Sequence, residues 1–236
     1  MISRPKPRNS WLSVLILIAA VALWGYNQTQ PSRPEKPAGR PTSVARNKPE
    51  RPVAGNPAGI EKTGGYEVYR NCTLVDARNN DGDSFMLRLP DGRQEEFRLY
   101  FVDTPESAFK SYRGGETNHR RIEQQAADMG GITPEQAVEI GKQGKRFTLG
   151  LLASRPFDLY TRWDSPYHDN RFHAFLQVKQ DGKPRWLEEL LVERGLVRIH
   201  TKPADLPDGT SAATQKARLK DLERAAKRAE AGVWGL

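Results

Sequence analysis

The stretch from Asp81 to Glu106 constrains the fold most, because it is typical of one β-hairpin with acidic residues at both ends. Its centre, Leu89-Pro90-Asp91-Gly92-Arg93, is a turn sequence, since proline presets φ and glycine accepts a positive φ. β-prone runs flank this turn on both sides. In an antiparallel pair centred on the turn, Asp83 lies roughly opposite the residues just before Asp103. The hairpin therefore predicts that two carboxylates 20 residues apart in sequence are neighbours in space.

The positive charge of the chain is concentrated outside the predicted domain. The 236 residues carry a net charge of +8 at neutral pH, a balance that suggests nucleic-acid binding. However, residues 1–65 hold 10 Lys and Arg against 3 Glu, whereas residues 66–236 hold 27 against 26 acidic residues. Net charge is therefore no evidence for the substrate of the domain. The single cysteine, Cys72, excludes an intrachain disulfide and a cysteine-based metal site.

Residues 1–30 contain a predicted membrane segment. Three basic residues precede an uncharged apolar run from Trp11 to Tyr26, which its neighbours can extend toward the roughly 20 residues of a full span. A cleaved signal peptide is the alternative, since Ala20-Val21-Ala22 has the small-x-small pattern of a cleavage site. A buried helix of a soluble protein is a third interpretation. By the positive-inside rule, the first two predict a domain outside the cytoplasm: membrane-anchored in the periplasm or at the cell surface, or secreted.

Residues 31–65 are predicted to form a disordered linker. The stretch 27–65 carries seven of the 17 prolines of the chain, with almost no large apolar side chain. Such a composition buries too little apolar surface to offset the entropy of ordering. Because a Pro-rich chain is extended and semi-rigid, we expect a tether between the membrane segment and the domain. Its cations could also contact anionic lipid or a polyanionic substrate.

Residues 66–236 are predicted to form one α+β domain. The first of three predicted helices, 134–153, begins with the capping box Thr133-Pro134-Glu135-Gln136. Residues 107–132 are interpreted as a long loop with one helical turn. The other predicted helices are 186–194 and 211–231, and the predicted strands outside the hairpin are 67–70, 72–75, 157–163, 171–178 and 196–200. Short strands with interposed helices favour a five-stranded OB-fold barrel.

The acidic ends of the hairpin suggest a site for a hard cation. The carboxylates of Asp83 and Asp103, with the backbone carbonyl of Thr104, are oxygen donors that suit Ca²⁺ or Mg²⁺. Arg98 lies within a strand, where an unpaired guanidinium is costly, and Arg171 begins a strand of the same predicted barrel. Two guanidinium groups, a metal and a carboxylate base can stabilise a pentacoordinate phosphate and activate water. Taken singly, each aspartate is more often a turn residue and each arginine a surface ion-pair partner.

Five short blocks follow one another along the domain. They are Asp81-Gly82-Asp83-Ser84, Phe97-Arg98-Leu99-Tyr100-Phe101-Val102-Asp103-Thr104-Pro105-Glu106, Asn170-Arg171-Phe172-His173-Ala174, Arg194-Gly195-Leu196 and Gly232-Val233-Trp234. In this order the blocks resemble the staphylococcal nuclease-like (thermonuclease) family, over about residues 66–236. The Arg-x-x-x-x-Asp-Thr-Pro-Glu block is specific, whereas the Gly and Trp matches count only through their order.

The resemblance implies an OB-fold barrel with three helices that hydrolyses phosphodiesters of DNA and RNA with calcium and leaves 3′-phosphate ends. At the matching positions, three residues would bind the Ca²⁺, two through carboxylates and one through its backbone carbonyl: Asp83, Asp103 and Thr104. Glu106 would orient or deprotonate the attacking water. Arg98 and Arg171 would bind the scissile phosphate.

The sequence also departs from the family pattern. Asn170 stands where a glycine is usual, and His200-Thr201-Lys202 replaces a tyrosine-rich stretch that flanks the bound nucleotide. The segment 107–132 is longer than the family pattern predicts. These changes leave the phosphate chemistry intact and concern base stacking and substrate preference.

Two other functions are compatible with the sequence. One is a non-catalytic OB-fold module, tethered to the membrane, that binds nucleic acid or a protein, because a fold can persist after its catalytic activity is lost. The other is a structural tether that holds envelope polymers through its basic linker. The presence of all five catalytic-type side chains favours the enzyme. We expect DNA or RNA as substrate, the membrane as a partner of residues 1–30, and a monomer.

Overall fold

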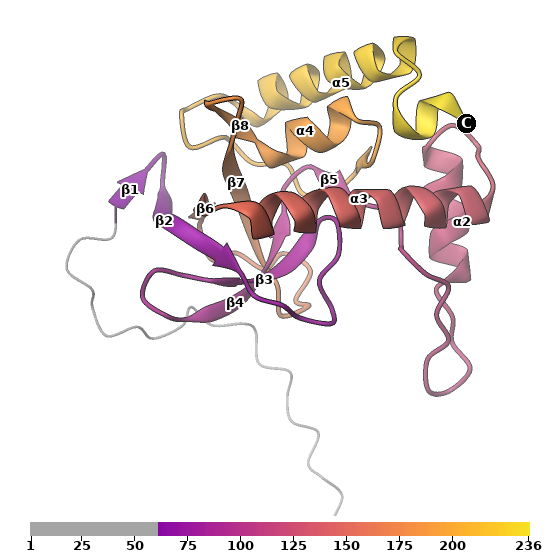
Figure 1. Ribbon diagram of the computed structural model, residues 1–236, viewed down its shortest axis with the longest axis horizontal. Helices are drawn as coiled ribbons and strands as arrows, with labels where there is room; N and C mark the ends of the chain where they lie inside the picture. The colour runs from indigo at the N-terminus through magenta and orange to yellow at the C-terminus, as the bar shows by residue number, and fades with distance from the viewer. Residues whose placement is uncertain (1–60) are drawn as a thin grey trace, which may run out of the picture. The chain divides into compact units, whose positions relative to one another are not determined.

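Five strands close into a mixed β-barrel in the computed structural model, which describes residues 61–236 (Figure 1). In their order around the barrel, they are β2 (Tyr66–Leu74), β3 (Ser84–Arg88), β4 (Gln94–Leu99), β7 (Phe172–Gln180) and β6 (Phe157–Thr161). Neighbours pair antiparallel except β4 and β7, which are parallel, and the pairing of β2 with β6 closes the barrel. The predicted α+β class is confirmed, and the barrel is consistent with an OB-fold.

The predicted hairpin is present. Strands β3 and β4 pair from Ser84 opposite Arg98 to Arg88 opposite Gln94. The Leu89 amide donates to the Arg93 carbonyl at 2.9 Å across the turn, and Gly92 has a φ of +87°. The turn chemistry of proline and glycine therefore fixes the register that sets both acidic ends of the hairpin side by side.

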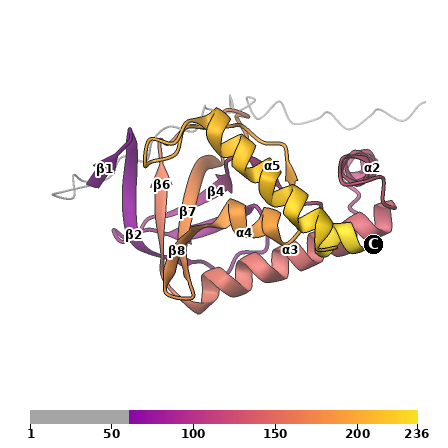
Figure 2. The ribbon, with the colours of Figure 1, turned by 90° about the horizontal axis from the view of Figure 1, so that it is seen from above.

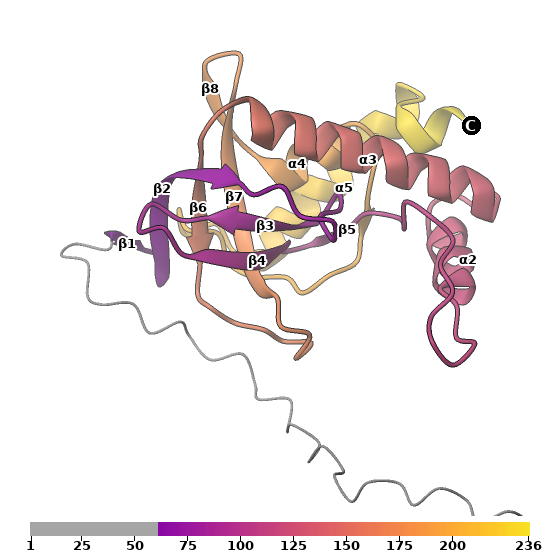
Figure 3. The same ribbon diagram turned by 60° about the horizontal axis from the view of Figure 1, so that its bottom comes forward.

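Four α-helices accompany the barrel in residues 61–236, so the prediction of three is wrong. They are α2 (His119–Asp128), α3 (Pro134–Ser154), α4 (Leu187–Glu193) and α5 (Ala212–Arg228), followed by the 3₁₀ helix η1 (Gly232–Gly235). Helix α2 lies in the predicted loop 107–132. Its sequence is mostly polar and its apolar face is short: only Ile122, Gln125 and Ala126 are buried, and no side chain caps its N-terminus. Figure 3 shows α2 beside the end of α3 that lies away from β1.

Helix α3 confirms the predicted capping box. The Thr133 hydroxyl accepts from the Gln136 amide at 3.2 Å, and the Gln136 side chain accepts from the Thr133 amide at 2.9 Å. At this end of α3, Ala137 and Val138 pack against Ile122 of α2 in a small apolar cluster. The contact fixes α2 on α3, although few of its own residues are apolar.

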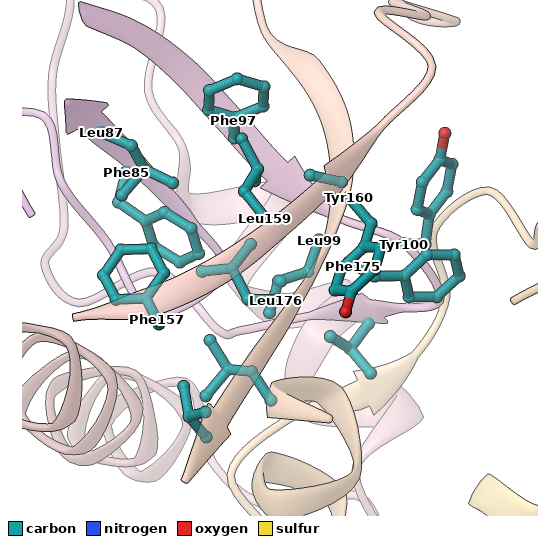
Figure 4. Close-up of a cluster of buried hydrophobic side chains, with 14 of the residues drawn as sticks. Phe85, Leu87, Phe97, Leu99, Tyr100, Phe157, Leu159, Tyr160, Phe175 and Leu176 are labelled. Atoms are coloured by element: carbon teal, nitrogen blue, oxygen red, sulfur yellow. The ribbon is translucent and has the colours of Figure 1, made fainter. Parts of the chain in front are cut away.

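The main core fills the barrel interior, where alternate residues of each strand point inward. Phe85 and Leu87 of β3 meet Phe97 and Leu99 of β4 there, as Figure 4 shows together with Leu159 of β6. All five side chains are fully buried. Complete burial of one such side chain contributes about 1.5–3 kcal/mol to folding, so the strands that carry the candidate site are firmly held.

Four short strands complete the described structure. Strand β1 (Glu61–Thr63) forms a hairpin with β2 through Gly64 and Gly65, whose φ angles are +53° and +79°. The last five residues of the predicted linker, 61–65, thus form a strand and a tight turn with β2. Strand β8 (Lys183–Trp186) pairs with β7, and β5 (Val102–Asp103) pairs with β9 (Arg198–Ile199).

The predicted membrane segment of residues 1–30 and residues 31–60 of the linker lie outside the described residues. Within residues 61–236, no helix combines the length and the apolar character needed to cross a bilayer.

Helices α4 and α5 bury an acidic side chain between them, and Figure 2 shows the two helices next to each other. One carboxylate oxygen of Glu188 accepts from Gln215 Nε2 at 3.4 Å. Its second oxygen and the Gln215 side-chain oxygen have no hydrogen-bond partner among the described residues. Burial, aided by the charge of Glu189 and opposed by that of Arg218, raises the pKa of Glu188 to about 8. The fold therefore favours the protonated form near neutral pH.

Glu188 predicts a pH dependence of stability. Between its ordinary pKa of 4.5 and its folded pKa of about 8, the folded state binds the proton more tightly than the unfolded state does. The free energy of unfolding that Glu188 contributes therefore falls as pH rises through this window. Glu188→Gln is expected to abolish this dependence and to raise the melting temperature at pH 9 by about 2–4 °C for each kcal/mol recovered. Melting curves from pH 5 to 9 measure it.

Glu189→Gln is the matched control for this prediction. Glu189 already pairs with Arg218 at 3.0 Å, so its substitution is expected to leave the fall in stability above pH 5 in place. A Glu188→Gln protein with the wild-type dependence of melting temperature on pH would contradict the buried protonated carboxyl.

Candidate active site

The hairpin brings the two predicted aspartates to one guanidinium. The Leu99 amide donates to the Asp83 carbonyl at 2.9 Å, which places Asp83 at the open end of the hairpin beside Arg98. Arg98 Nη2 lies 3.2 Å from Asp83 Oδ2 and 2.5 Å from Asp103 Oδ1. All three side chains are buried. The predicted convergence of Asp83, Asp103 and Arg98 is therefore present in the structure.

Asp103 is surrounded by cationic and amide donors. Its Oδ1 also accepts from Arg121 Nη2 at 2.9 Å, and its Oδ2 accepts from Arg198 Nε at 2.9 Å and Gln125 Nε2 at 3.0 Å. Burial would raise the pKa of Asp103, but these neighbours, Arg121 first and then Arg98, lower it below its ordinary value. The carboxylate is ionised and its oxygens are engaged by donors from α2, β4 and β9.

Glu106 lies next to this cluster on a loop that packs directly against α3. A Cβ placed on Gly141 would come within 2.4 Å of the Pro105 carbonyl oxygen, so the close contact requires glycine. Glu106 Oε1 is 3.1 Å from Arg121 Nε, while its Oε2 is 3.4 Å from Asn118 Nδ2 and from Lys110 Nζ. Arg121 thus bridges Glu106 and Asp103.

Arg171 reaches the same site from the start of β7. Its guanidinium pairs with Asp169, with Nε 3.0 Å from Asp169 Oδ2, and its Nη1 is 3.4 Å from Ser84 Oγ, next to Asp83. A pocket of about 280 Å³ joins the two predicted arginines to Asp103. Its lining residues are Arg98, Asp103, Arg121, Tyr167, Asp169, Arg171, Arg198, His200 and Thr201.

The three predicted metal donors differ in how far their oxygens are already engaged by other groups. Asp83 Oδ2 is buried without a hydrogen-bond partner among the described residues, and burial raises the pKa of Asp83 to about 7 against the effect of Arg98. A cation would add a ligand contact at that oxygen, which lies 3.2 Å from Arg98 Nη2. At Asp103, by contrast, a cation must displace a donor. Thr104 offers a carbonyl that already accepts from Gln125 at 3.2 Å.

Residues 61–236 contain no cluster of three or more His, Cys, Asp or Glu side chains arranged for a metal ion. The predicted donor set consists of two carboxylates and a carbonyl. The donors are hard oxygens, and one of them, Asp83 Oδ2, accepts no hydrogen bond among the described residues, so the set suits Ca²⁺ once one guanidinium leaves Asp103.

Three residues of the site are absent from the sequence-based prediction: Arg121 and Gln125 of α2, and Arg198 of β9. Gln125 is fully buried, and besides Asp103 and Thr104 it contacts Glu106, whose amide donates to its Oε1 at 3.0 Å. Arg121 and Gln125 are four positions apart, a spacing that puts both on one face of a helix. This signal points to the site only when residues 119–128 are recognised as helical.

No protein-family model matches the sequence, and a search of the curated proteins found no significant match.

Proposed function

We propose that this protein is a calcium-dependent phosphodiesterase that hydrolyses DNA, RNA or both. The observation that carries the proposal is the pocket that Arg98 and Arg171 share with Asp103, with Glu106 linked to Asp103 through Arg121. Guanidinium groups that line one pocket, with carboxylates beside them, suit a phosphate that is attacked by water. The resemblance to the staphylococcal nuclease-like family and the OB-like barrel support the same reading.

Phosphate binding falls to Arg98 and Arg171. Arg98 is held by Asp83 and Asp103, and Arg171 by Asp169, so each guanidinium is oriented before substrate arrives. Oriented donors lose little freedom on binding and stabilise the charge that builds on the phosphate oxygens as a fifth oxygen approaches phosphorus.

Water activation falls to Glu106. A carboxylate at this position can accept a proton from the attacking water as the bond from water oxygen to phosphorus forms and the bond from phosphorus to the 5′-oxygen breaks. Arg98 or Arg171 would donate a hydrogen bond to the 5′-oxygen as it leaves. The products expected from the family resemblance are a 3′-phosphate and a 5′-hydroxyl.

Asp83, Asp103 and the Thr104 carbonyl are the residues that would hold Ca²⁺. When bound, the ion would supply positive charge to the phosphate oxygens. Gln125 keeps the Thr104 carbonyl and the Glu106 backbone in fixed relation to Asp103, so the donors and the base move as one unit.

We further propose that residues 1–30 anchor the enzyme in a membrane with its domain outside the cytoplasm, or direct its secretion when cleaved. The substrate would then be extracytoplasmic nucleic acid. The apolar run 11–26 and its basic flank support this location.

The alternative function is a non-catalytic OB-fold module that binds nucleic acid. One observation favours it: both oxygens of Asp103 are engaged by donors, a pattern also expected of a purely structural ion network. In such a module, the arginines of the pocket would bind phosphate without water activation.

A cleavage assay separates the two functions. Full-length protein is incubated with plasmid DNA and with single-stranded RNA, in Ca²⁺ or in EGTA, while polarisation of a labelled oligonucleotide reports binding. The enzyme predicts degradation in Ca²⁺ that EGTA stops. Binding without degradation in Ca²⁺ would refute the enzyme and support the module.

A further inference from the structure

Arg121 stands between two carboxylates that the proposed reaction needs. Its Nη2 lies 2.9 Å from Asp103 Oδ1, and its Nε lies 3.1 Å from Glu106 Oε1. The Arg121 side chain is thus ion-paired both with Asp103, a predicted cation ligand, and with Glu106, the predicted base. It comes from α2, in the part of the chain that is longer than the family pattern predicts.

Arg121 is also the least buried of the three arginines on Asp103. Its side chain is 45% exposed, against 8% for Arg98 and 9% for Arg198. Asp103 is buried, but water reaches Arg121, so a separated Arg121 would be hydrated, whereas a separated Arg98 or Arg198 would remain a buried unpaired charge. Among the three arginines, Arg121 is therefore the one whose guanidinium can leave Asp103 without becoming a buried, unpaired charge.

The surroundings of Arg121 allow its side chain to move without its helix. Ile122 and Gln125 are buried and fix α2 in place, while Arg121 itself lines the pocket with Arg98 and Arg171. When Arg121 turns away, Glu106 keeps Asn118 and Lys110 as neighbours. A phosphate in the pocket offers the guanidinium a new anionic partner within the same cavity.

We propose that Arg121 is a substrate-responsive gate: without substrate it pairs with Asp103 and Glu106 and competes with the cation, and with substrate it transfers to a phosphate. This inference rests on the proposed function and adds its regulation. Nucleic acid binding would thereby free Asp103 for the cation and Glu106 for the attacking water at the same time. The affinity for Ca²⁺ would therefore be higher when substrate is bound.

The test compares Arg121→Ala with Arg120→Ala in the full-length protein. Arg120 is the exposed neighbour on the same helix, so its substitution removes the same charge away from the site. Calorimetric titration with Ca²⁺ alone should show affinity increased at least about threefold in Arg121→Ala and nearly unchanged in Arg120→Ala. Polarisation of a labelled oligonucleotide in EGTA should show binding weakened at least about threefold in Arg121→Ala only. Arg121→Lys, which retains the charge, should lie between wild type and Arg121→Ala in both titrations.

Several results would overturn the gate. They are equal effects of the two alanine substitutions, weaker Ca²⁺ binding by Arg121→Ala, or no Ca²⁺ binding by wild type. Circular dichroism confirms that each variant is folded. Failure of the proposed function would give a different result. A wild type that binds Ca²⁺ but cleaves neither DNA nor RNA would refute the enzyme, and the competition between Arg121 and Ca²⁺ for Asp103 could still be measured.

Discussion

Replacing Glu106 with glutamine is expected to lower the rate of DNA cleavage by about two to four orders of magnitude, the usual contribution of a general base. Glutamine keeps the size of the side chain, and the Glu106 amide can still donate to Gln125. The amide group has no carboxylate to accept a proton from water, so the loss falls on the chemical step. Single-turnover rates at saturating Ca²⁺ measure it.

Glu116→Gln is the control for this substitution, because Glu116 is an exposed carboxylate in the segment 107–132 that follows Glu106. We expect a rate within about twofold of wild type, as for surface changes away from a site. Oligonucleotide affinity should be similar in both variants. A Glu106→Gln protein that cleaves at the wild-type rate would remove Glu106 from the mechanism.

Gly141→Ala is expected to damage the site although alanine favours helix more than glycine does. The added Cβ would lie 2.4 Å from the Pro105 carbonyl oxygen and 2.5 Å from the Glu106 carbonyl oxygen. Backbone atoms on both sides must shift, which displaces Glu106 relative to Asp103. Overpacking of this kind costs about 1–3 kcal/mol in stability, and a displacement of about 1 Å can cost about 100-fold in rate.

Gly150→Ala in the same helix is the matched control. Among the described residues, a Cβ at position 150 would meet no atom within 4 Å outside its chain neighbours and the backbone of its own helix, so the substitution should raise the free energy of unfolding by about 0.5–1 kcal/mol and leave the rate unchanged. Denaturant unfolding and cleavage rates test both variants. Equal effects of the two substitutions would show that the contact between α3 and the Glu106 loop does not position the base.

Local sequence signals were sufficient for much of the fold. The Pro90 and Gly92 turn and the Thr133 capping box each act through neighbouring backbone, so residue identity alone predicts them. Helix α2 lacks such signals, because its apolar face is short and its N-terminus has no side-chain cap. The Gly64-Gly65 pair is ambiguous, since the same residues suit a linker and a hairpin turn.

The candidate site could be predicted in part for the same reason. Asp83, Arg98 and Asp103 meet through a single hairpin, which is a local feature. Arg198 reaches Asp103 through the β5–β9 pairing across 95 positions of sequence, and Arg121 comes from a mostly polar helix with a short apolar face. The donor that competes for Asp103 is therefore visible only in the folded chain.

The origin of the oxygen in the product tests the central claim, hydrolysis by activated water, most directly. Full-length protein cleaves a DNA oligonucleotide in Ca²⁺ and ¹⁸O-labelled water, and mass spectrometry identifies the ends; DNA has no 2′-hydroxyl to act in place of water. The predicted result is a 3′-phosphate that carries one ¹⁸O atom, beside a 5′-hydroxyl, with no product in EGTA. An intact oligonucleotide in Ca²⁺, or cleaved ends without the label, would contradict the account.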